Sequence, residues 1–308
     1  MHFPLFDLHC DTAYEMYRQK QGLTRNNLAI SLENAEIFPN CVQVMALWTD
    51  YRLSNEEGWD ACKKMYLNLI SDSAIKSNRA MLVTQCPVLP MCKNAFFLGI
   101  EDARIFNGDE MRVDTLWNMG VRFLTPLWKG ETCIGGSHDT EVGLTDFGKR
   151  AIDRALKRGM ILDISHASER SAKDIFEIAA QHGRPVIATH SNAYDVCPVS
   201  RNLRRWQVEE ILHCNGVVGL NLYPSFLRYD KKAVLADLLP HIDYFLELGL
   251  EHNLCLGCDM DGADMPPEIQ TVADLERLAE LLLAHCYSES FVNALFFANA
   301  YRFASINL

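Results

Sequence analysis

Short apolar runs alternate with amphipathic helical stretches along most of the chain, and this alternation restricts the fold more than any other feature. The runs are continuously apolar, which is typical of strands buried on both faces and therefore of a parallel sheet. Glycines such as Gly120 and Gly159 close several helical stretches just before the next run, where a helix C′ position favours glycine. Eight runs have this character: 5–9, 41–48, 95–101, 121–128, 160–166, 185–190, 216–222 and 253–259.

Eight parallel strands in a chain of 308 residues predict an α/β fold, namely a (β/α)8 TIM barrel. Two further helices, 272–286 and 289–303, are expected to pack outside the barrel. A doubly wound sheet is the competing α/β fold, but it needs a glycine-rich turn after the first strand, and Cys10-Asp-Thr-Ala13 is not one. We therefore expect one domain over residues 1–308. The helices expected between the strands are 55–77, 113–119, 145–158, 169–182, 207–214 and 234–248.

Charge and hydropathy exclude several classes of partner. The net charge of −11 argues against nucleic-acid binding, which needs basic stripes to neutralise phosphates. No segment approaches the ~20 apolar residues of a membrane span, and neither a secretion signal nor a lipid-anchor tail is present. We therefore expect a cytoplasmic protein without a membrane anchor.

The eleven cysteines are odd in number and scattered, which favours reduced, mostly buried thiols over disulfides. Cys255-Leu-Gly-Cys258 has the spacing of a redox or zinc motif. It lies in an apolar run rather than at a helix start, so a structural role is expected.

Barrel enzymes carry their active sites at the carboxyl ends of the strands, so the residues at those ends predict the chemistry. His9 and Asp11 end the first run and share one face of a strand, while Cys10 points the other way. Imidazole and carboxylate ligands suit zinc. We expect a binuclear zinc centre in which Glu101 bridges the ions and a bridging hydroxide is the nucleophile. The candidates at later strand ends are Glu101, His166, His190 and Asp259.

These strand ends resemble the renal (membrane) dipeptidase family, zinc dipeptidases of the amidohydrolase-type barrel superfamily, in its bacterial-type branch. The matching segments follow the family order from residue 7 to residue 262. They include Asp7-Leu-His-Cys-Asp-Thr12, Gly99-Ile-Glu101, Gly143-Leu-Thr-Asp-Phe-Gly148, Gly159-Met-Ile-Leu-Asp-Ile-Ser-His166, Thr189-His-Ser-Asn-Ala193, Ser200-Arg-Asn202 and Leu256-Gly-Cys-Asp-Met-Asp-Gly262.

The resemblance implies two zinc ions per subunit. His9 and Asp11 would bind one ion, His166 and His190 the other, and Glu101 would bridge them. It also implies that the substrate is a dipeptide, that a D-residue is often allowed at its C-terminal position, and that the protein is a homodimer.

The resemblance also assigns residues to the substrate. Arg201, eleven residues after His190, would grip the C-terminal carboxylate of the dipeptide. Asp259 would carry the proton to the leaving amine; Asp261 can share its face, and the choice between them rests on family register. Asp163 would orient the metal ligands from behind.

Trp128 departs from the family pattern, because members of the renal type carry at this position a histidine thought to polarise the scissile carbonyl. Some bacterial branches share the tryptophan. We expect Trp128 to contact the substrate, and His138 or Lys129 to supply the missing positive partner unless they are ordinary solvated charges. Substrate preference is expected to lie in the strand-end loops 49–57, 129–142 and 223–231.

Two other functions compete with dipeptide hydrolysis. A related metal-dependent amidohydrolase would act on a non-peptide amide, an ester or a similar bond, but those branches usually show His-x-His where this chain has His9-x-Asp11. A barrel that binds without catalysing is the second alternative, and only Trp128 favours it.

Overall fold

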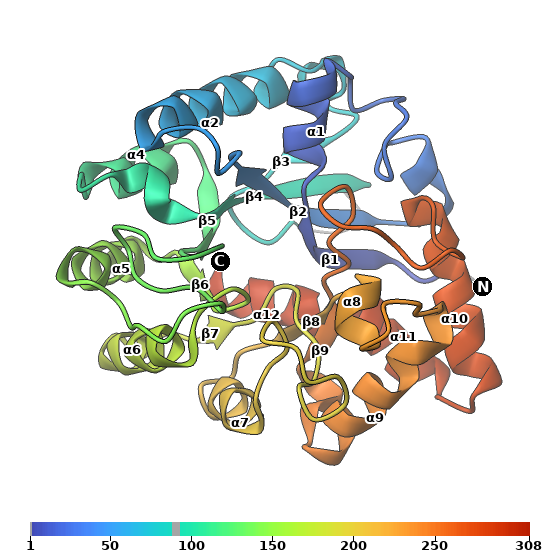
Figure 1. Cartoon of the computed structure of the whole chain (residues 1–308). Helices are drawn as coiled ribbons and strands as arrows, with labels where there is room; N and C mark the ends of the chain where they lie inside the picture. Colours follow the sequence, from blue (N-terminus) through green and yellow to red (C-terminus); the bar gives the residue numbers. More distant parts are fainter. Residues whose placement is uncertain (1, 88–92) are drawn as a thin grey trace.

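A ring of parallel strands forms the centre of the computed structural model, which describes residues 2–87 and 93–308 (Figure 1). Within the described residues, eight strands lie side by side in the order β7-β6-β5-β4-β2-β1-β9-β8. These strands lie within the eight predicted runs or extend them by one residue, and the predicted barrel is confirmed. The strands are β1 (Leu5–Cys10), β2 (Cys41–Trp48), β3 (Met81–Leu82), β4 (Asn94–Glu101), β5 (Val121–Thr125), β6 (Ile161–Asp163), β7 (Val186–Ile187), β8 (Val218–Leu220) and β9 (Leu254–Leu256).

The ring closes between β7 and β8 through backbone hydrogen bonds. The Ala188 amide donates to the Val217 carbonyl at 3.0 Å, and the Gly219 amide donates to the Ala188 carbonyl at 2.8 Å. Glycine is needed here, because a Cβ on Gly219 would lie 1.9 Å from the Thr189 carbonyl oxygen and one on Gly257 only 1.7 Å from it. The missing side chains let three strands approach closely enough to complete the barrel.

The short strand β3 was not predicted from the sequence. It pairs with the first half of β4, where Met81 and Leu82 lie opposite Ala95 and Phe96, while β5 pairs with β4 only from Leu98 onward. Two residues with a partly exposed pattern carry no periodic signal, so only the free edge of β4 identifies this strand.

Helices surround the ring, and most begin or end at the residues that the sequence indicated. Thr145 caps α5 by accepting a hydrogen bond from the Gly148 amide, and Gly159 ends it at φ 96°. The helix α1, directly after the first strand, and the short helix α8 were not predicted. The helices are α1 (Thr12–Gln19), α2 (Asn55–Ile70), α3 (Ser73–Lys76), α4 (Met111–Asn118), α5 (Asp146–Arg158), α6 (Glu169–Gln181), α7 (Arg205–His213), α8 (Pro224–Leu227), α9 (Leu239–Glu247), α10 (Leu275–Ala284), α11 (Glu289–Asn293) and α12 (Asn299–Asn307), with a π-helical turn, Ala294–Ala298, before α12.

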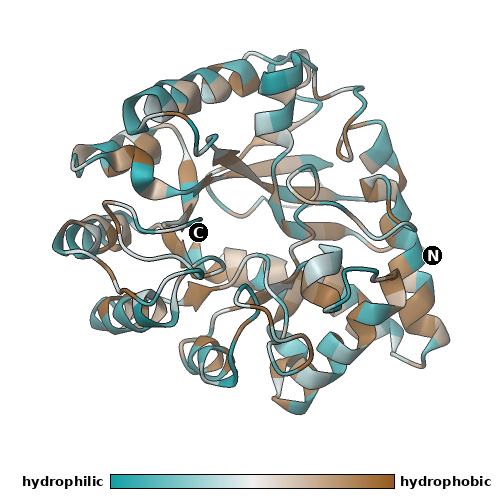
Figure 2. Cartoon of the chain, viewed as in Figure 1, coloured by the Kyte–Doolittle hydropathy of each residue, from teal (hydrophilic) through white to brown (hydrophobic). Residues whose placement is uncertain are grey.

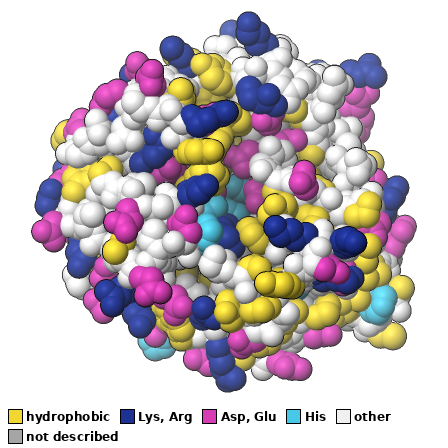
Figure 3. Space-filling view, viewed as in Figure 1, with side chains coloured by type: hydrophobic (Ala, Val, Ile, Leu, Met, Phe, Trp, Pro, Cys, Tyr) yellow, Lys and Arg dark blue, Asp and Glu magenta, His cyan; other side chains and the backbone are white. Residues whose placement is uncertain are grey.

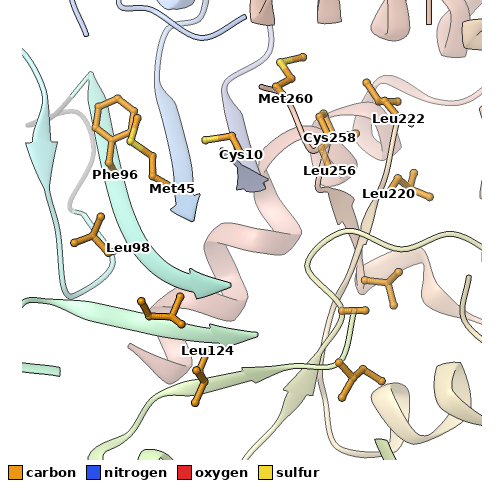
Figure 4. Packing of buried hydrophobic residues seen from close by; sticks show 14 of the residues in the cluster. Cys10, Met45, Phe96, Leu98, Leu124, Leu220, Leu222, Leu256, Cys258 and Met260 are labelled. Atoms are coloured by element: carbon orange, nitrogen blue, oxygen red, sulfur yellow. The ribbon is translucent and has the colours of Figure 1, made fainter. Parts of the chain in front are cut away.

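Two apolar layers hold the barrel together. Outward-facing strand residues such as Met45, Leu98 and Leu256 pack beneath the helices (Figure 4), and Figure 2 shows strands that are mostly hydrophobic beside helices of mixed character. Inward-facing residues fill the amino-terminal half of the barrel, where the Phe6 and Phe97 rings stack with centroids 6.0 Å apart.

The end of the chain closes the bottom of the barrel. Phe297 and Phe303, from the π-helical turn and α12, pack against the inward-facing cluster that contains Phe6 and Ile161. Both terminal helices were expected to lie outside the barrel. This is right for α10, whose buried face joins the outer layer. It is incomplete for α12, because Phe303 also packs against the inward-facing cluster. Since this end is filled, the open end of the barrel is the one where the strands terminate. One domain over residues 1–308 remains a prediction.

Candidate metal centre

The predicted metal ligands and Asp259 come from the ends of five separate strands and meet at the carboxyl end of the barrel. Figure 3 shows histidine, acidic and basic side chains gathered in a hollow near the middle of this face. All of them are largely buried although they are charged or titratable, which indicates a functional cluster rather than a solvated rim. They are His9, Asp11, Glu101, His166, His190 and Asp259.

An irregular register at the end of β1 turns His9 into the barrel. Asp7 Oδ1 accepts the backbone N–H groups of His9 at 3.1 Å and Cys258 at 3.0 Å, and the pairing of β1 with β2 shifts between Asp7 and Cys10. Cys10 joins the outer apolar layer beside Met45 and Cys258 (Figure 4). The prediction that Cys10 points away from His9 is confirmed.

One group of donors lies around the imidazole of His9. Its Nε2 atom is 3.6 Å from Asp11 Oδ2 and 3.9 Å from Asp259 Oδ1, and one donor atom from each of the three residues lies within 4.8 Å of the others. The sequence placed only His9 and Asp11 at this ion beside the bridging Glu101. The structure adds Asp259 to the same group.

Glu101 stands between this group and two further histidines. Its Oε2 atom is 3.5 Å from His9 Nε2, whereas its Oε1 atom is 2.9 Å from His166 Nε2 and 3.4 Å from His190 Nε2. The two imidazole Nε2 atoms are 3.0 Å apart. Each carboxylate oxygen thus faces a different group of donors, which is the geometry of a bridging ligand.

The donor atoms fit divalent cations. His9 Nε2 and Asp11 Oδ1 are buried without a hydrogen-bond partner in the described part of the chain, a costly arrangement unless a further group is bound there. Burial lowers the pKa of His166 to about 3, so this ring is neutral near pH 7, as a metal ligand must be. Burial followed by the charge of Glu101 raises the pKa of Asp11 to about 7, and a cation would relieve this crowding of carboxylates.

Contacts on the side away from the site orient the imidazole rings of His166 and His190, and Asp163 takes part in those of His190 as predicted. Asp163 Oδ2 accepts the hydroxyl of Thr189 at 2.5 Å, and that hydroxyl oxygen lies 2.7 Å from His190 Nδ1. The Nδ1 atom of His166 is 3.0 Å from the Trp128 carbonyl oxygen. With each Nδ1 bonded away from the site, both rings present Nε2 to it.

Asp259 and Asp261 have different hydrogen-bond partners in the structure. Asp259 Oδ2 accepts a hydrogen bond from Asn221 Nδ2 at 3.0 Å, which leaves Oδ1 facing His9. The Asp261 carboxylate instead accepts from the Thr12 hydroxyl at 2.6 Å and the Ala29 amide at 2.7 Å. Sequence reasoning missed Asn221, whose only signal was its place at the end of the seventh predicted run.

A cavity of about 1130 Å³ opens above these residues. Arg201 lines it with a side chain that is 95 % buried, and its Nη1 and Nη2 atoms have no hydrogen-bond partner in the described residues. The guanidinium group packs over the Phe226 ring at 5.1 Å. Burial lowers the pKa of Arg201 to about 10, so it remains a cation at neutral pH.

Trp128 belongs to an aromatic wall on another side of the cavity. Its ring lies edge-on to Trp48 with centroids 5.2 Å apart and stacks on Tyr51 at 5.6 Å, and Lys129 Nζ lies 5.3 Å from the Tyr51 ring. His138 also lines the cavity, with its ring 6.0 Å from that of His166. Burial lowers the pKa of His138 to about 4, so its ring is neutral near pH 7 and offers a hydrogen bond rather than a charge.

The other sequence predictions concern the cysteines and membranes. All cysteines within the described ranges are free thiols. Cys255, in β9, is buried in the inward-facing cluster, and Cys258, two residues after the strand, is buried in the outer layer. Cys92 lies outside the described residues. Over residues 2–87 and 93–308, no helix combines the length and apolar character needed to cross a bilayer.

Both the sequence and the structure of the chain resemble those of known proteins. The sequence model of the membrane dipeptidase family (peptidase family M19) matches residues 1–306. An uncharacterised protein from the pqqA 5′ region of Klebsiella pneumoniae is 34 % identical over 215 residues, 66 % of this chain and 78 % of that protein. Dipeptidase aclJ of Aspergillus oryzae is 29 % identical over 196 residues, 60 % of this chain and 45 % of that protein.

Two solved structures superpose on the whole barrel. Dipeptidase AC, a metallopeptidase of family M19, is 25 % identical with a TM-score of 0.91, covering 100 % of this chain and 99 % of its own. A metallopeptidase from Rhodobacter sphaeroides, bound to a phosphinate mimic of the dipeptide L-Ala-D-Ala, is 24 % identical with a TM-score of 0.91 over 100 % of both chains. The second likeness bears on the fold alone.

Proposed function

The chain belongs to the membrane dipeptidase family of metallopeptidases, and from this membership we propose that it hydrolyses free dipeptides at a centre of two zinc ions. The observation that carries the proposal is the position of Glu101. One carboxylate oxygen faces His9 and the other faces His166 and His190, at the base of a cavity lined by a buried arginine whose Nη atoms have no hydrogen-bond partner in the described part of the chain.

The donor set divides into two groups that share Glu101. His9 and Asp11, with Asp259 in reach, would hold one ion. His166 and His190, both beside Glu101 Oε1, would hold the other, and His190 also lies within reach of His9 and Glu101 as a set of three donors. Nitrogen and oxygen donors without thiolate suit zinc. Once bound, two such ions would supply Lewis-acid activation of the peptide carbonyl and of the attacking water.

Arg201 would fix the carboxylate end of the dipeptide. A buried guanidinium without acceptors is costly, and a carboxylate supplies two acceptors in the planar geometry that guanidinium prefers. Because such a clamp fixes the carboxylate and not the last side chain, it is compatible with a D-residue at that position. Comparing L-Ala-L-Ala with L-Ala-D-Ala as substrates tests this point.

Asp259 would move the proton. Asn221 holds its Oδ2 atom, and the free Oδ1 atom faces the metal ligands, so the carboxylate can accept a proton from the attacking water and pass it to the departing nitrogen. Trp128, with Trp48 and Tyr51, would line the side of the cavity against a substrate side chain. The homodimer and the cytoplasmic location stay predictions.

The test combines metal content with product release. Elemental analysis should find about two zinc ions per chain, and a panel of dipeptides should release free amino acids. Glu101→Gln should lose one or both ions together with activity, because an amide offers one weak acceptor where two anionic oxygens were shared. Asp264→Asn, at an exposed acid on the cavity wall, should keep both.

Other results would redirect the proposal. If Glu101→Gln keeps full metal content and turnover, the bridging role is wrong. If zinc binds but no dipeptide is cleaved, the related hydrolase of a non-peptide amide or ester becomes the better function.

A further inference from the structure

A second cavity of about 390 Å³ lies beside the one that contains the metal ligands. Its walls come from the loop after His138, the start of α6 and the segment before α7. Its volume is within the range of small-ligand sites. Of the described residues, His138 is the one that lines both cavities; the second is otherwise lined chiefly by Glu169, Arg170, Ser200, Asn202 and Arg204.

The segment Ser200-Arg-Asn202 runs along the division between the two spaces. Arg201 lines the first cavity, whereas Ser200 and Asn202 line the second. His138 lines the first cavity together with Arg201, and its Nδ1 atom contacts Ser200, the residue directly before Arg201. The carboxylate of a dipeptide held by Arg201 would therefore end beside His138.

Hydrogen bonds hold this division in place. His138 Nδ1 lies 2.8 Å from the Ser200 hydroxyl, a contact that joins loops 62 residues apart. The His138 amide donates to the carbonyl of the metal ligand His166 at 2.8 Å, and the Ser137 amide donates to the Gly130 carbonyl at 2.9 Å. A ring fixed at its backbone and at its Nδ1 atom is a wall rather than a mobile side chain.

We propose that the His138–Ser200 pair is the partition that limits the substrate to two residues, and that the second cavity would accept a third residue if the partition were opened. This inference rests on the proposed dipeptidase function and deepens it. Each further residue extends a peptide by about 3.3–3.6 Å, and His138 stands where that extension would pass. Arg170 lines the space beyond and can receive the displaced carboxylate, whereas Arg204, which also lines it, is paired with Glu169 at 3.1 Å.

The test compares the kcat/KM values for Ala-Ala and Ala-Ala-Ala in the zinc-loaded full chain. His138→Gly removes the partition while keeping the backbone N–H that donates to His166, so zinc content should be unchanged. The ratio of tripeptide to dipeptide kcat/KM should rise by about tenfold or more, with Ala and Ala-Ala as products of the tripeptide.

Two other variants keep the test decisive. Ser200→Ala removes only the hydroxyl that holds the ring and should raise the ratio by a smaller factor; it decides the matter if His138→Gly does not fold or loses zinc. Glu141→Ala truncates another residue that lines the second cavity but has no part in the His138–Ser200 contact, and it should leave the ratio unchanged.

The outcomes separate the two proposals. If the wild-type chain does not cleave Ala-Ala, the proposed function is wrong and this inference falls with it. If the wild type cleaves Ala-Ala and neither His138→Gly nor Ser200→Ala raises the ratio, the partition alone is overturned. A ratio raised equally by Glu141→Ala would also overturn it.

Discussion

Replacing Arg201 with methionine should lower activity and raise stability at the same time. The Arg201 side chain is 95 % buried, and its two Nη atoms have no partner among the described residues. The cation is therefore costly in the free protein and useful only when a carboxylate arrives. A structural arginine would behave in the opposite way, since its loss would destabilise the fold.

The expected loss of activity and the expected gain in stability both follow from the contacts and the burial of the Arg201 side chain. Two charge-assisted hydrogen bonds at about 1.5–3 kcal/mol each are worth about 3–6 kcal/mol, or a 10²–10⁴-fold loss in kcat/KM. Burial lowers the pKa of Arg201 from 12.5 to about 10. Since the group is charged at pH 7 in both the folded and unfolded states, this shift costs the folded state about 3 kcal/mol. The lost contact with Phe226 offsets about 0.5–1 kcal/mol, so the free energy of unfolding should rise by about 2 kcal/mol.

The assay uses Ala-Ala and Ala-Ala amide, which lacks the carboxylate, together with urea unfolding at saturating zinc. The wild type should prefer Ala-Ala over the amide by about 10²-fold or more in kcat/KM. Arg201→Met should cleave the two substrates with nearly equal kcat/KM, and the loss for Ala-Ala should come mainly from a higher KM. Arg204→Met, at an arginine that lines the second cavity, should keep the preference. If Arg201→Met is less stable and loses kcat/KM equally for both substrates, Arg201 is structural and the clamp is refuted.

Three further variants probe groups around the barrel. Asp163→Asn should weaken zinc binding about 10–100-fold by disturbing the Thr189–His190 contact, measured by competition with a chelator; unaltered affinity would contradict the orienting role. Burial lowers the pKa of His241 to about 4 in the folded state, so the unfolded chain takes up a proton first as pH falls below about 6.5. Between pH 7 and 5 this should lower the free energy of unfolding by about 2 kcal/mol, and His241→Gln should abolish that part of the slope in urea titrations at the two pH values. Arg104→Met should cost about 3–5 kcal/mol of unfolding free energy, because it removes donors from the carbonyls of Thr49, Asp50 and Leu53 and leaves a buried aspartate unpaired; a loss within about 1 kcal/mol would contradict this anchoring role.

The candidate metal ligands could be picked out from the sequence because of their position at strand ends. His9, Glu101 and His190 each come at or next to the end of an apolar run, and parallel strands bring such ends to one rim whatever the loops do. The choice of Asp259 over Asp261 could not be made from position at a strand end. Both have φ 65° and lie two residues apart, so only their partners, Asn221 in one case and Thr12 in the other, separate them.

Two features of the fold had no local signal. The sequence periodicity of the last helices predicts amphipathic segments, but not that Phe297 and Phe303 enter the barrel from below. Likewise, β3 forms because the first half of β4 offers a free edge, and a two-residue strand has no period to read.

The sequence by itself determined the parallel barrel, the family and the set of candidate metal ligands, because each of these depends on residue type and on spacing along the chain. Only the tertiary structure decided that Asp259 joins the His9 group, that the buried Nη atoms of Arg201 have no hydrogen-bond partner among the described residues, and that His138 meets Ser200 between two cavities. Those facts depend on segments far apart in the sequence meeting in space, and local propensity carries no information about such contacts. The strand ends thus fix which candidate metal ligands are available, and the loops shape the cavities around them.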